Sequence, residues 1–95
     1  MTAAGRLSML KANLQIIAAN TAYDSYLEQL LIVAEQMITR EGVTLTETFE
    51  DDNLIVMYAA YLYRKRVEDN PRMPRMLRYA LNNRLFSQKV GAVNV

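Results

Sequence analysis

The densest cluster of residues able to do chemistry in this 95-residue chain is a run of three carboxylates, Glu50, Asp51 and Asp52. Carboxylate oxygens bind calcium, but a calcium loop needs regularly spaced oxygen ligands around a glycine turn, and the run has neither. The same residues suit the beginning of a helix, where negative charge interacts favourably with the helix dipole. We therefore expect no metal site here, and interpret the run as helix-start charge or as salt-bridge partners of a neighbouring subunit.

Other catalytic and metal-binding chemistry lacks its usual residues. The chain has no histidine and no cysteine, which removes the commonest general base, the commonest metal ligand and all thiolate chemistry. The three glycines are too scattered to form a phosphate-binding loop. We expect a protein that is not an enzyme and that has no catalytic residue, metal or cofactor.

Positive charge gathers in the last third of the chain and could bind nucleic acid. Arg75, Arg78 and Lys89 fall on one stripe of a predicted helix, and arginine binds phosphate groups well. These three residues are candidates for sequence-independent contact with DNA, although a charged stripe on a helix is usually its solvated face. The Arg64-Lys65-Arg66 run ends another predicted helix, where cations complement the dipole.

The elements that must position these residues are helices. Hydrophobic periodicity predicts an all-α fold, a small bundle of about four helices in a single domain over residues 1–95. The first helix is expected over 6–18, the third over about 52–68, and the fourth from Pro74, which suits a first helical turn, to about Gln88. Residues 43–45 form a short extended segment in this interpretation, and residues 1–5 and 90–95 are flexible tails.

The second helix has the clearest pattern. Thr21 followed by Asp24 resembles a capping box at its start, and Gly42 is a natural stop. Nine apolar residues share one broad face: Tyr23, Tyr26, Leu27, Leu30, Leu31, Val33, Ala34, Met37 and Ile38. Ile32 stands alone in the middle of the polar face. It is either a contact to a neighbouring subunit or an ordinary exposed isoleucine, which is common.

Two features predict association with other copies of the chain. The stretch from Leu54 to Tyr63 has no polar face, so we expect a second subunit to cover part of it. Charge is also divided, because residues 1–59 carry three cations and eight carboxylates whereas residues 60–95 carry eight cations and two carboxylates. A net −5 part and a net +6 part can steer subunits head to side.

The charge division defines a candidate subunit interface. Its acidic side consists of Glu50, Asp51 and Asp52, and its basic side of Arg64, Arg66, Arg72 and Arg84. Ile32 completes the set. The competing interpretation is that these charges pair within one subunit.

Three blocks of sequence resemble the small head–tail connector proteins, also called head-completion or adaptor proteins, of long-tailed bacteriophages and prophages. They are Asn20–Leu27 with the closing Glu41-Gly42-Val43, then Met57–Arg66, and then Met73–Lys89. The likeness covers about residues 10–89. It implies a four-helix subunit of a ring, typically of twelve copies in the virion, that sits beneath the portal while DNA passes through its centre.

The resemblance also implies partners and a location. The partners are other copies of the chain, the portal protein and a further head-completion or tail protein, and the location is the virion, or the bacterial cytoplasm during assembly. The longest apolar run has ten residues, and about 18 are needed for a membrane span, so we expect a soluble protein. Two rivals remain open: a small DNA-binding regulator with a helix-turn-helix, and a dimeric protein-interaction module.

Overall fold

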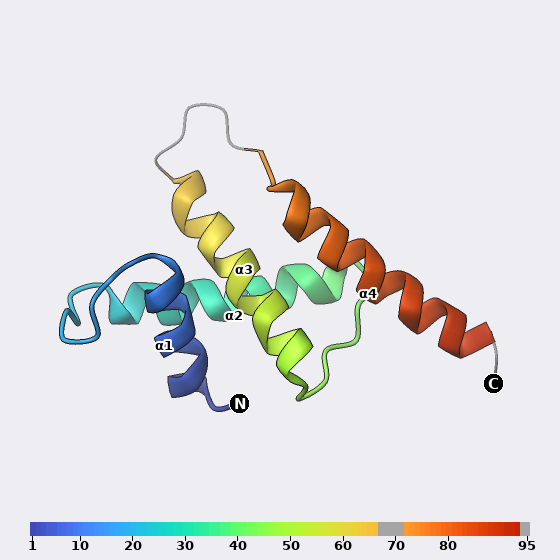
Figure 1. The fold of residues 1–95 in the computed structure, drawn as a ribbon, viewed down its shortest axis with the longest axis horizontal. Helices are drawn as coiled ribbons and strands as arrows, with labels where there is room; N and C mark the ends of the chain where they lie inside the picture. Colours follow the sequence, from blue (N-terminus) through green and yellow to red (C-terminus); the bar gives the residue numbers. More distant parts are fainter. Residues whose placement is uncertain (67–71, 94–95) are drawn as a thin grey trace.

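The protein is all-α, as the sequence predicts. The computed structural model describes residues 1–66 and 72–93, and in them the chain forms four helices and no strand. In chain order these are α1 (Ala3–Asn13), α2 (Asp24–Arg40), α3 (Phe49–Lys65) and α4 (Arg75–Val93). Helices α1, α2 and α3 pack together, and α4 lies against α3 (Figure 1).

Helix α3 is the centre of the core because it contacts each of the other three helices. Its buried apolar side chains point in several directions around the helix: Leu54, Ile55, Val56, Tyr58, Ala59 and Ala60. The chain itself therefore covers most of the apolar Leu54–Tyr63 stretch. Met57, Tyr61, Leu62 and Tyr63 stay half-buried, so the expectation that a second subunit covers part of this stretch stays a prediction.

Helix α2 buries most of the face that the periodicity predicts, but Tyr23 and Val33 of that face are exposed, because Tyr23 precedes the first helical residue and Val33 lies at the edge of the face. Leu27, Leu30, Leu31, Ala34 and Ile38 are all buried, mainly against α3. The start of α2 differs from the prediction.

The capping box expected at this start does not form. Tyr23 occupies the cap position without a side-chain hydrogen bond. The Asp24 carboxylate instead forms an ion pair with Lys11, at 2.9 Å.

Helix α1 begins earlier and ends earlier than expected. Thr2 caps its start by accepting a hydrogen bond from the Gly5 N–H, so residues 3–5 are helical and the prediction of a flexible segment there was wrong. The helix ends at Asn13 rather than near residue 18, because the buried Lys11 ammonium draws the following loop back. That ammonium donates hydrogen bonds to the carbonyl oxygens of Ala18 and Asn20.

Helix α3 begins a few residues before the predicted start. Thr48 is the cap residue, and its hydroxyl accepts a hydrogen bond from the Asp51 N–H. Glu50, Asp51 and Asp52 consequently lie in the first turn, where their charge suits the helix dipole. The helix ends at Lys65, and residues 67 and 68 of the predicted range lie outside the described part of the chain. Residues 43–46, which precede the cap, are neither helix nor strand.

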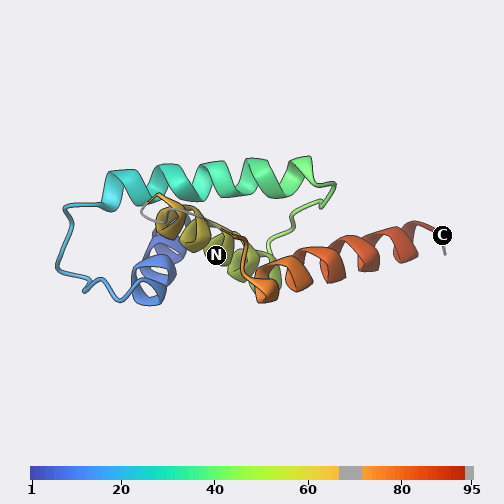
Figure 2. The same cartoon turned by 90° about the horizontal axis from the view of Figure 1, so that it is seen from above.

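Helix α4 starts directly after Pro74, whose carbonyl accepts a hydrogen bond from the Arg78 N–H. Leu77 and Leu81 are buried against the rest of the protein. The helix continues to Val93, so residues 90–93 are helical and do not form the tail that we expected; residues 94 and 95 lie outside the described residues. The C-terminal half of α4 extends away from the other helices (Figures 1 and 2).

Candidate assembly interface

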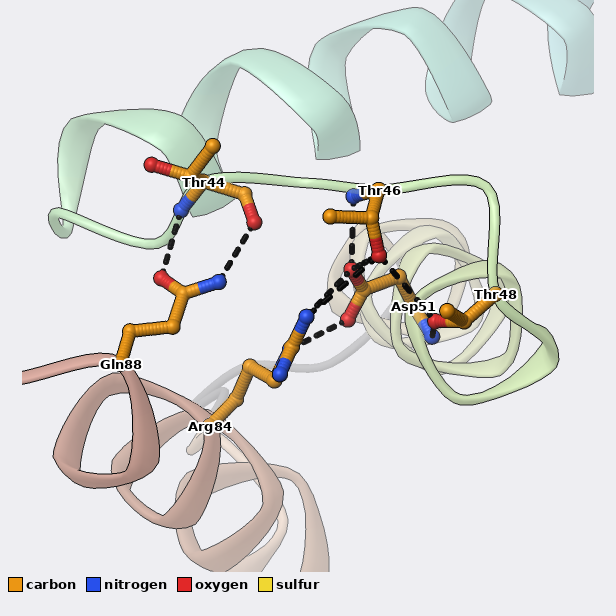
Figure 3. A network of polar contacts seen from close by, with 6 residues as sticks. All are labelled: Thr44, Thr46, Thr48, Asp51, Arg84 and Gln88. Atoms are coloured by element: carbon orange, nitrogen blue, oxygen red, sulfur yellow. Dashed lines mark hydrogen bonds and ion pairs between the residues drawn. The ribbon is translucent and has the colours of Figure 1, made fainter. Parts of the chain in front are cut away.

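A buried carboxylate fixes the position of α4 against α3. Asp51 has no exposed surface, and its two carboxylate oxygens receive the Arg84 guanidinium at 2.8 and 3.1 Å. The backbone N–H and the hydroxyl of Thr46 donate to the same carboxylate at 2.7 and 2.8 Å (Figure 3). One carboxylate thus joins the first turn of α3, the loop before it and the middle of α4.

The protonation of this pair follows from its contacts. Burial acts to raise the pKa of Asp51, but the hydrogen bonds from Arg84 and Thr46 outweigh it, and the pKa lies below its ordinary value of 3.8. The hydrogen bond to Asp51 raises the pKa of Arg84. Both groups are therefore charged at neutral pH, and the pair is a permanent link rather than a switch.

A second polar contact fixes the rotation of α4 about its axis. The Gln88 side-chain amide accepts a hydrogen bond from the Thr44 N–H at 2.8 Å and donates one to the Thr44 carbonyl at 2.6 Å (Figure 3). Gln88 lies one helical turn after Arg84, on the same side of α4 as Leu77 and Leu81. This inner side faces the core, so the opposite side of α4 must face outward.

The outward side of α4 is apolar, which is unusual for a helix face without a partner. Met76, Tyr79, Phe86 and Val90 are exposed, with 74%, 59%, 68% and 40% of their surface accessible. With Asn83, they are spaced alternately by three and four residues, which is the pattern of a helix seam that packs on another helix. We call these five residues the outer stripe.

Basic residues border the outer stripe. Arg75 and Lys89 are exposed, whereas Arg78 forms an ion pair with Glu41 at 2.6 Å. The three residues predicted to contact DNA therefore differ in their surroundings: Arg78 binds a carboxylate of the same chain, and the other two are open to solvent.

Three residues that were predicted to lie at the subunit interface form ion pairs within their own chain. Asp51 pairs with Arg84 of its own chain, and Asp52 pairs with Arg6 of its own chain at 3.4 Å. Our assignment of Asp51, Asp52 and Arg84 to contacts between subunits was wrong, since the alternative of pairing within one subunit holds for these residues. The fold brings the acidic start of α3 directly against α1 and α4.

The other predicted basic residues have varied surroundings. Arg64 donates to the Asn13 carbonyl and side chain, at 3.3 and 3.2 Å. The Arg66 guanidinium lies over three tyrosine rings, with the nearest centroid, that of Tyr63, at 4.4 Å. Arg72 and Glu50 are exposed. Arg64 and Arg66 thus already contact groups of their own chain. The assignment of the exposed residues Arg72 and Glu50 to a subunit interface stays a prediction.

Ile32 is 58% exposed and borders an apolar hollow. The hollow has a volume of about 190 Å³ and lies between α1 and α2. Its lining consists of Ala3, Arg6, Glu28, Leu31, Ile32 and Glu35. We call it the α1/α2 hollow. Ile32 is therefore part of a shaped surface that contains apolar and acidic groups.

Sequence reasoning missed three features of the structure. It did not identify the outer stripe, although the heptad spacing from Met76 to Val90 was available in the sequence. It also missed Lys11, whose signal was its place beside Leu7, Leu10 and Leu14 on the apolar side of α1. The α1/α2 hollow had no sequence signal, because it depends on how two helices pack.

Comparisons with protein-family models, with curated proteins and with solved structures found no match. Over residues 1–66 and 72–93, no helix combines the length and the apolar character that crossing a bilayer requires. In the same ranges, no three carboxylates lie close enough together to hold a metal ion. The geometry of the surfaces is therefore the main structural evidence for function.

Proposed function

We propose that the protein is a structural subunit of an oligomeric ring that joins the head of a tailed bacteriophage to its tail. The observation that carries the proposal is the outer stripe of α4. An exposed apolar face with helix-packing spacing marks a surface that binds protein. The likeness of three sequence blocks to head–tail connector proteins suggests which assembly that is.

The proposed role is structural and not enzymatic. A chain without histidine or cysteine lacks the commonest catalytic side chains. The partners in this proposal are further copies of the chain, the portal protein and a head-completion or tail protein, and the location is the virion. DNA passes through the centre of the ring in this proposal, and Arg75 and Lys89, which are exposed in the free chain, are candidates for sequence-independent contact with it.

The helix-turn-helix rival is less well supported. Helices α3 and α4 are separated by residues 66–74, whereas a helix-turn-helix unit uses a turn of about three or four residues. Contact with DNA in the proposed ring should instead ignore sequence and weaken steeply with salt.

Light scattering and negative-stain electron microscopy of the purified chain test the proposal. We expect particles several-fold larger than a dimer, with a central opening. A dimer at all concentrations would favour the interaction module, and a monomer would remove the support for a self-assembling ring.

A gel-shift titration with two unrelated DNA duplexes tests the DNA contact. We expect equal, salt-sensitive affinities that fall in Lys89→Glu and not in the control Arg40→Glu, which removes an exposed cation of α2. Preference for one duplex would favour the regulator.

A further inference from the structure

The outer stripe and the α1/α2 hollow are different surfaces of one chain, with complementary chemistry. The stripe offers large apolar side chains bordered by Arg75 and Lys89. The hollow offers an apolar floor bordered by glutamates. This inference rests on the proposed function and specifies how neighbouring subunits make contact.

The charge around the hollow is acidic. Glu28 is exposed, and Glu35 forms an ion pair with Arg6. The Arg6 guanidinium also contacts the buried Asp52, which in turn pairs with the N-terminal ammonium of Met1 at 3.4 Å. Three carboxylates, those of Glu28, Glu35 and Asp52, thus outnumber the two cations beside the hollow. An incoming basic helix would therefore meet net negative charge.

The size of the hollow suits an aromatic side chain. A cavity of about 150 Å³ in a protein core can hold benzene. The α1/α2 hollow, at about 190 Å³, is large enough for the ring of Phe86, and Leu31 and Ile32 supply apolar contacts.

A symmetric pairing of two α4 helices fits the charges less well. In an antiparallel pair, Arg75 of one copy would approach Lys89 of the other, and like charges repel. In a parallel pair Arg75 would face Ala80, which provides no opposite charge. The acidic hollow provides the opposite charge that both symmetric arrangements lack.

We propose that the outer stripe of one subunit docks on the α1/α2 hollow of a second copy, with Phe86 entering the hollow beside Ile32. Lys89 lies about one helical turn from Phe86, as Glu28 and Glu35 each lie about one turn from Ile32, so Lys89 faces one of these two glutamates of that copy. The contact is heterologous, because each subunit uses two different surfaces. Repeating it gives a ring if the rotation per step closes, and an open filament if it does not.

This placement has a consequence for the DNA contact. In the assembled ring, Lys89 is directed at the neighbouring subunit, so it is less available to DNA than in the free chain. Assembly and DNA binding through Lys89 should therefore compete.

Two variants test the contact, one on each surface. Phe86→Asp damages the outer stripe and leaves the hollow intact, whereas Ile32→Asp damages the hollow and leaves the stripe intact. Both side chains are largely exposed, so each variant should keep the circular dichroism spectrum and melting behaviour of the parent chain. Each should weaken self-association about 30-fold or more, as expected for a central residue of an interface.

Mixing the two variants gives the decisive measurement. Each variant alone should be monomeric where the parent chain assembles, and the mixture should form a 1:1 dimer and nothing larger, because one intact stripe meets one intact hollow. The matched control is Val33→Asp, which places the same charge on α2 about 100° around the helix from Ile32, outside the lining of the hollow. The control should assemble like the parent chain.

Each outcome has a separate meaning. If the parent chain assembles and Ile32→Asp assembles equally well, the proposed contact is wrong, and symmetric pairing of α4 or another surface is responsible, but the ring proposal stands. If both variants are monomeric and their mixture stays monomeric, the two surfaces do not bind each other and the contact is wrong. A parent chain that never associates contradicts the self-assembling ring itself.

Discussion

Replacing Arg84 by alanine is expected to lower the free energy of unfolding by about 3 kcal/mol. The substitution leaves the Asp51 carboxylate, which has no exposed surface, without the cation that neutralises it. Breaking a buried ion pair by removing one partner typically costs about 3–5 kcal/mol. We expect the lower end of this range, because Thr46 still donates two hydrogen bonds to the carboxylate.

A double-mutant cycle separates the free energy of the Asp51–Arg84 interaction from the effects of each substitution on the surrounding residues. Asp51→Asn alone should cost less than Arg84→Ala, because the released guanidinium is 17% exposed and can turn toward water. Adding Asp51→Asn to Arg84→Ala should recover part of the loss, since the double variant has no buried charge. The coupling free energy should be about 1–3 kcal/mol, the usual range for residues in direct contact.

Urea denaturation followed by circular dichroism measures these values. The control is Arg40→Ala, which removes an exposed arginine of α2 outside both proposed surfaces and should change the free energy of unfolding by less than about 1 kcal/mol. If Arg84→Ala costs no more than this control, the Asp51 carboxylate does not depend on Arg84, and our account of how α4 is fixed is wrong.

The remaining predictions concern pH, the core and two helix ends. The pKa of Asp51 is lower in the folded chain than its ordinary value of 3.8, so its stabilisation is present above about pH 4 and is lost as the pH falls through the folded pKa. In acid, the difference in unfolding free energy between the parent chain and Asp51→Asn should therefore shrink, and a constant difference would show that the pKa of Asp51 is not lowered by folding. Leu31→Ala should cost about 2–5 kcal/mol in chemical denaturation, because Leu31 is buried, whereas Val33→Ala on the exposed side of α2 should cost far less. Gln15 has a φ of 60° and Gly42 a φ of 104°, and this left-handed region of the backbone favours glycine. Gln15→Gly should therefore raise the melting temperature and Gly42→Ala should lower it, by the equivalent of about 1 kcal/mol each. A change of the same sign in both variants would show that backbone strain at these two positions does not govern stability.

The amino-acid sequence was enough to predict the class of fold. Helical periodicity in α2 predicted its five buried residues, because a helix that covers a core must place apolar side chains every three or four positions, but it also placed Tyr23 and Val33 on that face, and both are exposed. Pro74 predicted the start of α4 for a similarly local reason, since proline fits a first turn and no later one. The isolated position of Ile32 on a polar face also predicted its exposure.

The helix ends were decided by contacts between segments. The sequence favoured a longer first helix, but Lys11 binds the carbonyl oxygens of Ala18 and Asn20 and the carboxylate of Asp24, which closes the chain into a loop after Asn13. No local propensity encodes these bonds, because they require α2 to lie beside α1.

The distribution of charge along the chain was visible in the sequence, but which charged residues pair with one another was not. A net −5 part and a net +6 part suggested contacts between subunits, and the tertiary structure instead brings Asp51 to Arg84 and Asp52 to Arg6 within one chain. The sequence determined the amounts of apolar surface and charge, since these depend only on composition and helical spacing. Only the packing of α1 and α4 on α3 decided which of these charges are neutralised inside the subunit and which apolar side chains remain outside, because both depend on which side of a helix faces the core.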